Sequence, residues 1–99
     1  MSASNLSASQ LRALRLADDA PLGLVRLSES FHGLPDRSER VQSQSLRILA
    51  RRGLVEERRE SFGCRVFITP RGRAELADVD RARAVLEVQH DLFADGGAA

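Results

Sequence analysis

The sequence predicts a mainly α-helical domain of the α+β class, with one small β-hairpin and a long C-terminal helix. Apolar residues recur at helical spacing before Gly53 and after Thr69. After Gly53 the pattern changes to that of strands, because Val66 and Ile68 alternate with Arg65 and Phe67. A single β segment between helical segments predicts helices arranged around one hairpin.

Length and composition indicate one globular domain. The chain has 99 residues, of which 42% are apolar and 29% are charged. No apolar run approaches the roughly 20 residues that span a bilayer, and the first residues lack the basic flank of a signal peptide. We therefore expect a soluble, cytoplasmic protein. Because Cys64 is the only cysteine, no disulfide can form within the chain.

The N-terminal segment predicts an arm followed by a helix. Residues 1–6 are expected to form a disordered arm. Ser7 to Gln10 has the form of a capping box, in which each of these two side chains bonds the other residue's backbone N–H. The first helix is therefore expected to begin at Ala8 and to end at Asp18 to Pro21.

A second, shorter helix is predicted next. An extended stretch around Leu22 to Leu24 leads into it. Val25, Leu27 and Phe31 then indicate the helix, which Gly33 is placed to close as its C-terminal cap.

The third predicted helix runs from about Ser38 to Arg52. Asp36 or Ser38 can cap its start, and Gly53 is placed to end it. Apolar side chains fall on one side of this helix and long polar side chains on the other. The polar side comprises Arg40, Ser43, Gln44, Arg47 and Arg51.

A β-hairpin and a last helix complete the predicted elements. The strands of the hairpin are Leu54 to Arg59 and Cys64 to Ile68, joined by a turn at Ser61 to Gly63. Thr69 as a cap and Pro70 as the first helical residue then start the last helix.

The last helix, residues 70–94, is too long for the rest of the domain to cover, because about 24 residues at about 1.5 Å each span about 36 Å. Its apolar stripe therefore predicts a partner, and the simplest partner is the same helix of a second chain. The predicted dimerisation residues are Leu76, Val79, Ala82, Leu86 and Phe93. Residues 95–99 are expected to form a frayed tail.

Positive charge is concentrated in the middle of the chain. The net charge is −1 over residues 1–36, +6 over residues 37–73 and −4 over residues 74–99. A basic centre between neutral and acidic ends is typical of a DNA-binding element within a larger scaffold. An arginine-rich solvated surface is the alternative interpretation.

Two short sequence segments and the order of the predicted elements resemble the MarR and PadR groups of bacterial regulators. Ser45 to Val55 is similar to the end of their recognition helix, and Phe67 to Leu76 is similar to the joint between their wing and the next helix. The resemblance implies a winged helix-turn-helix fold over residues 7–69 with a long C-terminal dimerisation helix. It also implies a transcriptional regulator in the cytoplasm of a bacterial or phage-infected bacterial cell.

A helix fits the major groove of B-DNA, where Arg reads guanine and Gln or Asn reads adenine. We therefore expect sequence-specific binding of double-stranded DNA by a repressor-like homodimer, with the third helix in the major groove. The hairpin is expected to contact the minor groove or the backbone. The predicted DNA-binding residues are Arg37, Arg40, Gln42, Ser43, Gln44, Arg47, Arg51, Arg58, Arg59 and Arg65.

Two other functions stay open from the sequence. The same DNA-binding surface can serve replication, excision or packaging of a phage or plasmid. The domain can also be a protein–protein adaptor, because a fold does not determine a function. An adaptor needs an apolar patch near the third helix or the hairpin, and Phe62 and Phe67 are its candidates.

Catalytic and cofactor motifs are missing from the sequence: it has no Gly-rich phosphate loop, no Ser-His-Asp arrangement and no convincing catalytic pair of carboxylates. We therefore expect neither enzyme activity nor a cofactor. Cys64 beside Arg65 is either a redox-sensitive or an inert thiol. His32, or His90 near the acidic tail residues Asp91 and Asp95, is a candidate for a metal ion shared across a dimer, but solvated side chains are the favoured interpretation.

Overall fold

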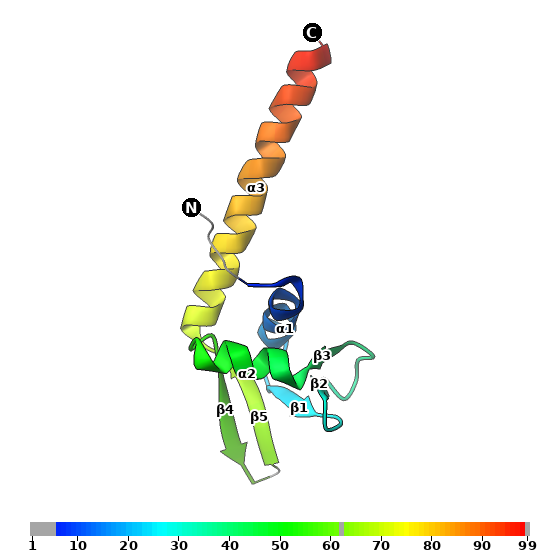
Figure 1. The fold of residues 1–99 in the computed structure, drawn as a ribbon, viewed down its shortest axis with the longest axis vertical. Coiled ribbons are helices and arrows are strands. Elements are labelled where there is room, and N and C mark those ends of the chain that lie inside the picture. The colour runs from blue at the N-terminus through cyan, green and yellow to red at the C-terminus, as the bar shows by residue number, and fades with distance from the viewer. Residues whose placement is uncertain (1–5, 62, 99) are drawn as a thin grey trace.

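The chain folds into three helices and one five-stranded sheet over the part that the computed structural model describes (Figure 1). The structure describes the backbone of residues 6–61 and 63–98, and their side chains except at position 60 and over 86–98. The helices are α1 (Ala8–Asp18), α2 (Ser43–Arg51) and α3 (Pro70–Ala98). The strands are β1 (Leu24–Arg26), β2 (Phe31–Gly33), β3 (Arg40–Gln42), β4 (Val55–Glu60) and β5 (Gly63–Ile68).

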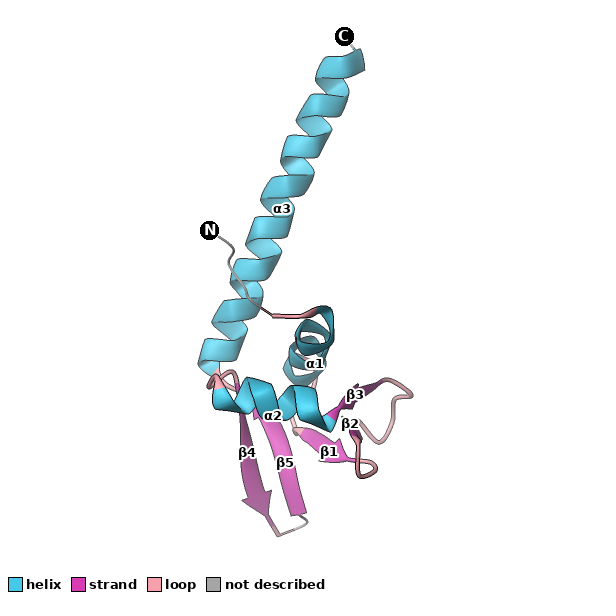
Figure 2. Cartoon of the chain, viewed as in Figure 1, coloured by secondary structure: helices cyan, strands magenta, loops and turns pink. Residues whose placement is uncertain are grey.

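The predicted fold class is wrong, because the sheet is much larger than one hairpin (Figure 2). All strands pair antiparallel in the order β3-β2-β1-β5-β4. The architecture is therefore an α+β fold built on this sheet, and not a mainly α fold with a small wing. Three strands separate α1 from α2, so the described residues contain no helix-turn-helix before α2.

The segment predicted as a second helix forms the β1–β2 hairpin. Leu27 and Phe31 are 36% and 38% exposed, so they do not form the buried stripe of a helix. Arg26 closes the turn, because its side chain donates to the carbonyl oxygens of Ser28 and Glu29 at 3.1 and 3.2 Å. Pairing with the sheet and these local bonds outweigh a weak helical pattern.

Gly33 is a strand residue and not a helix cap. It is absent from the glycines with left-handed φ angles. A Cβ atom at this position would lie 2.8 Å from the carbonyl oxygen of Glu39 and 2.9 Å from Leu27 Cδ1. The glycine is needed because two backbone segments approach each other closely here.

The third predicted helix begins later than the sequence indicates. Arg40–Gln42 forms strand β3, which pairs with β2, and the helix starts at Ser43. Neither Asp36 nor Ser38 caps it, since the cap position is Gln42 and no side chain bonds the first turn. Arg40 and Gln42 are therefore strand residues.

The end of α2 is confirmed at Gly53, which adopts a φ of +74°. Gly53 N donates to Ala50 O and Leu54 N donates to Leu49 O, both at 3.0 Å. These two bonds form the Schellman arrangement that ends helices at glycine. Leu49 and Leu54 are both buried, which adds the apolar contact that accompanies this arrangement.

Three other predictions are confirmed. α1 begins at Ala8 behind the predicted capping box, in which Gln10 N donates to Ser7 Oγ and Ser7 N donates to Gln10 Oε1, both at 3.2 Å. The predicted hairpin is β4–β5, paired from Val55 opposite Ile68 to the tip. The last helix begins at Pro70.

Thr69 connects the start of α3 to the end of α2. Its Oγ1 accepts from Gly72 N at 3.0 Å as a helix cap and donates to Gly53 O at 2.7 Å. A Cβ atom at Gly72 would overlap the carbonyl oxygen of Leu54, so this helix position has room only for glycine. α3 continues to Ala98, beyond the predicted end at residue 94.

The core lies between the helices and one face of the sheet. Its largest fully buried side chains are Leu14, Leu16, Leu24 and Leu49. Leu24 on β1 pairs with Val66 on β5, and both are buried, so their side of the sheet is the helix face. Because strand side chains alternate, Val25 and its partner Arg65 point to the opposite side, the outer face.

Two expectations about the ends of the domain remain. Of the expected arm over residues 1–6, only Leu6 is described, and it packs against the core. The frayed tail over residues 95–99 stays a prediction.

None of the described helices is both long and apolar enough to cross a membrane.

Candidate nucleic-acid interface

The predicted DNA-binding residues divide between the two faces of the sheet. The division follows from the strand register, in which Val41 and Val66 mark the helix face. The side of α2 and the helix face carry Ser43, Gln44, Arg47, Arg51 and Arg59. The outer face carries Arg40, Gln42, Arg58 and Arg65. These ten residues therefore do not form one surface, and Arg37 lies in the loop before β3.

Most of the predicted arginines outside the α2 side already have partners. Arg58 lies over the ring of Phe67, 4.6 Å from its centroid, and its Nε donates to Glu56 Oε1 at 2.8 Å. Arg65 Nη1 donates to the carbonyl oxygen of Leu22 at 2.9 Å. These side chains therefore have fewer N–H donors left for an anion than an arginine without such contacts.

Arg37 is also paired, since its Nη1 lies 3.6 Å from Asp19 Oδ2. Of the two adaptor candidates, only Phe67 is among the described residues. Phe67 is half-buried beneath Arg58, and Phe62 lies outside the described residues.

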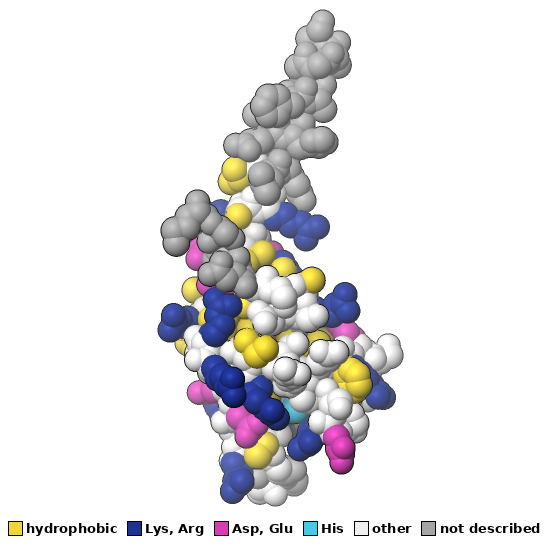
Figure 3. All heavy atoms as spheres, viewed as in Figure 1, with side chains coloured by type: hydrophobic (Ala, Val, Ile, Leu, Met, Phe, Trp, Pro, Cys, Tyr) yellow, Lys and Arg dark blue, Asp and Glu magenta, His cyan; other side chains and the backbone are white. Residues whose placement is uncertain are grey.

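Three arginines on the α2 side are available to a partner. Arg47, Arg51 and Arg59 are exposed, and none of them makes an ion pair or a hydrogen bond within the described part of the chain. Figure 3 shows dark-blue side chains gathered over α2 and the β4–β5 hairpin on the face turned to the viewer. Because they have no internal partner, these guanidinium groups can bind phosphate or a base edge without breaking the fold. Arg40 is likewise exposed and without such a bond among described residues, but it stands on the outer face.

The exposed side of α2 has the composition of a recognition helix. Ser45, Leu46 and Leu49 are buried, which leaves the opposite side to solvent. Gln44, Arg47 and Arg51 occupy that side at spacings of three and four residues. One helix side therefore presents an amide and two guanidinium groups together.

Arg26 is a residue of this side that sequence reasoning missed. It lies on β1 directly opposite His32 of β2 in the hairpin register. Both residues line the same cleft as Arg47. Arg26 could not be identified from the sequence, because the segment that contains it was predicted to be a helix. Its position opposite His32 depends on the pairing of two strands.

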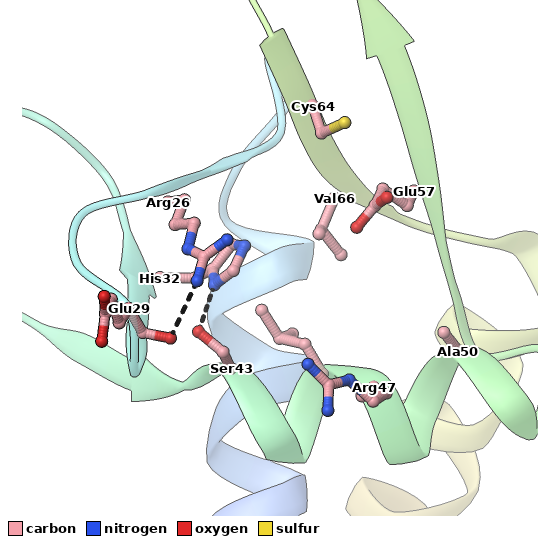
Figure 4. A pocket seen from close by; sticks show the side chains of 10 residues that line it. Arg26, Glu29, His32, Ser43, Arg47, Ala50, Glu57, Cys64 and Val66 are labelled. Atoms are coloured by element: carbon pink, nitrogen blue, oxygen red, sulfur yellow. Dashed lines mark hydrogen bonds between the residues drawn. The ribbon is translucent and has the colours of Figure 1, made fainter.

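The cleft lies between α2 and the β1–β2 and β4–β5 hairpins and has a volume of about 580 Å³. In Figure 4, Arg26 and His32 stand on one side of it and Glu57 and Val66 on the other. Ser43, Arg47 and Ala50 of α2 lie along its lower edge in the same view. It is an open space beside Arg47 of α2, and both charged and apolar side chains line it.

His32 is held in this cleft by a hydrogen bond. Its Nδ1 lies 2.7 Å from the hydroxyl oxygen of Ser43, the first residue of α2. Burial lowers the pKa of His32 below its usual 6.5, the charge of Arg26 lowers the pKa further, and Glu57 acts in the opposite direction. The ring is therefore neutral at neutral pH.

The cysteine hypothesis and the His32 part of the metal hypothesis concern residues that line the cleft. Cys64 is an exposed free thiol that also lines the cleft, and its redox role stays a prediction. Among the described residues, no group of three His, Cys, Asp or Glu side chains could hold a metal ion. The side chains of His90, Asp91 and Asp95 lie outside the described residues.

The predicted dimerisation residues have different surroundings along α3. Leu76 is only 5% exposed and belongs to the core of this chain. Val79 is half-buried and Ala82 is exposed. The side chains of Leu86 and Phe93 lie outside the described residues.

The candidate interface thus comprises a polar helix side, an adjoining cleft and arginines that have no ion pair or hydrogen bond among the described residues. No protein-family model, no curated protein and no solved structure matches this chain.

Proposed function

We propose that this chain binds double-stranded DNA sequence-specifically through α2 and the β4–β5 hairpin, and that it regulates transcription as a homodimer. The observation that carries the proposal is the set of exposed arginines on one side, Arg47, Arg51 and Arg59, which have no ion pair or hydrogen bond with described residues. A surface that leaves several guanidinium groups without acidic partners fits a polyanion better than it fits another protein.

The geometry of α2 supports a place in the major groove. A groove about 12 Å wide admits an α-helix. Gln44 and Arg47 are then the candidates for base edges, since an amide pairs with adenine and a guanidinium with guanine. Arg51 and Arg59 are the candidates for phosphate, which fixes the position of the helix without reading sequence.

The regulatory part of the proposal is based on the two sequence segments that resemble MarR and PadR regulators. Both segments have a structural role: Gly53 ends α2, and Thr69 to Gly72 begins α3, with Thr69 hydrogen-bonded to Gly53. The proposed dimer uses α3, whose described side chains from Asp80 to Val85 are all exposed. A dimer would present two copies of α2 to two half-sites.

The test measures binding to labelled random and selected duplexes at 50 and 200 mM salt by fluorescence anisotropy. Arg47→Ala should weaken binding to the selected duplex by about 5- to 150-fold, as expected for the loss of one base contact. Arg59→Ala should weaken binding to all duplexes and reduce the slope of log K against log salt by about 0.9.

Arg58→Ala is the matched control, because Arg58 is adjacent to Arg59 on the same strand and points to the outer face. The Arg58→Ala protein should bind DNA with the same affinity as the wild type. Absence of binding at 50 mM salt, or equal binding by the Arg47, Arg59 and wild-type proteins, would remove the proposal and favour an adaptor.

A further inference from the structure

The positive and negative charges that line the cleft beside α2 are equal in number. The net charge of the cleft therefore depends on whether one histidine is protonated. Two arginines and two glutamates line it. Around His32 they come from every neighbouring element: Arg26 from β1, Glu29 from the β1–β2 turn, Arg47 from α2 and Glu57 from β4, with the thiol of Cys64 from β5. These charges cancel while the imidazole is neutral, and the cleft becomes cationic when His32 takes up a proton.

The ring of His32 is oriented toward this space. The Ser43 hydroxyl can donate to Nδ1 of the neutral ring, whose proton then resides on Nε2. When Nδ1 takes up a second proton, the hydrogen bond reverses and Nδ1 donates to the Ser43 oxygen. Figure 4 shows the second ring nitrogen directed away from Ser43, toward the space in front of Val66. An acceptor in the cleft therefore meets an N–H donor, and a protonated ring gives that donor a full charge.

Arg47 of α2 lies next to the cleft that the His32 ring faces. Arg47 lines the cleft and has no ion pair or hydrogen bond with described residues. Arg26 is held beside His32 by its bonds to the turn. If α2 enters the major groove and the β4–β5 hairpin contacts the adjoining backbone, as proposed above, the cleft between these two elements would face the intervening phosphodiester strand.

We propose that this cleft receives a phosphodiester group of that strand, with His32 Nε2 and Arg47 as its hydrogen-bond donors, and that DNA binding takes up one proton at His32. The inference rests on the proposed function and adds a pH dependence to it. An anion at Nε2 stabilises the charged ring, so the pKa of His32 rises when DNA binds. Affinity therefore increases as the pH falls from the raised pKa of the complex to the lowered pKa of the free protein.

The test measures two quantities on the full chain. The first is the dissociation constant for one duplex between pH 5.5 and 8 at constant salt, for the wild type, His32→Gln and His90→Gln. The second is the pKa of each histidine, from its side-chain NMR signals with and without DNA. We expect the wild-type log Kd to change by up to about one per pH unit, the limit for one proton.

The His90→Gln protein should keep this dependence, and His32→Gln should lose it while still binding at pH 8. DNA should raise the pKa of His32. Inorganic phosphate at tens of millimolar, added in place of DNA, should raise that pKa less than DNA does.

Several outcomes would overturn the inference and leave the proposed function intact. They are DNA binding that does not depend on His32 protonation, a His32 pKa unchanged by DNA, or a larger shift with free phosphate than with DNA. The NMR measurement uses the wild type, so it decides the question even where His32→Gln folds poorly. Absence of DNA binding at every pH would instead contradict the proposed function itself.

Discussion

Arg15 of α1 and Asp80 of α3, 65 positions apart in the sequence, form a hydrogen-bonded ion pair with an Nη2–Oδ1 distance of 2.6 Å. The pair stands where α3 leaves the body, because the next described side chains along the helix, residues 81–85, are exposed. The hydrogen bond and the charge of Arg15 lower the pKa of Asp80 below its usual 3.8. The contact is therefore complete above that value and is lost as the pH falls through the lowered pKa.

Removing the charge of Asp80 should loosen the first turns of α3. We expect Asp80→Asn to increase amide hydrogen exchange between residues 76 and 84 at neutral pH, measured by mass spectrometry, with a small effect because the pair is partly exposed. Asp78→Asn is the control, since Asp78 pairs with Arg81 of the same helix. Equal exchange in the two variants would show that Arg15 does not anchor α3.

A methyl group at Gly72 should destabilise the joint between α2 and α3. Gly72→Ala places a Cβ atom against the carbonyl oxygen of Leu54, and we expect it to lower the free energy of unfolding by about 1–3 kcal/mol or more. Gly53→Ala meets no atom closer than 3.8 Å and suffers only from its φ of +74°, which costs about 1–2 kcal/mol. Urea unfolding of both variants checks the order, and a more stable Gly72 variant would contradict it.

The stability of the free protein should decrease on mild acidification because of His32. Its pKa is lowered in the folded state, so the unfolded chain binds a proton more readily. The free energy of unfolding should therefore fall as the pH drops below about 6.5 and level off below the lowered pKa, while carboxylates are still ionised. Urea midpoints between pH 5 and 8 measure it, and His32→Gln should show a weaker dependence; an unchanged dependence would assign it to other groups.

The proposed α3 dimer predicts that two similar alanines respond differently to substitution. Ala82 and Ala84 are both exposed, but at about 100° per residue they lie on nearly opposite sides of the helix. Ala82→Glu should give a monomer by sedimentation at concentrations where the wild type is a dimer, and Ala84→Glu should remain dimeric. A monomeric wild type at about 100 μM, or the same behaviour in both variants, would exclude this dimer.

Elements with local signals were predictable from the sequence. The capping box of Ser7 and Gln10, the stop at Gly53 and the start at Thr69 each depend on hydrogen bonds between residues close in sequence. Such bonds need only the right side chain or glycine at the right spacing.

The strands before α2 were not predictable in the same way. Each has three residues, too few to show alternation, and β1 is held by pairing of Leu24 with Val66 of the distant strand β5. The same register decides which arginines share a face. For that reason Arg58 and Arg59 appeared equivalent in the sequence, although the sheet turns them to opposite sides.

Strand β3 ends at Gln42 and α2 begins at Ser43, so no hinge separates the edge of the sheet from the proposed recognition helix. The backbone N–H of Ser43 also donates to the carbonyl oxygen of Ser30 in the β1–β2 turn, at 2.8 Å. If α2 binds in a DNA groove as proposed, a force on this helix would therefore be transmitted directly to strand β3 and to the β1–β2 turn.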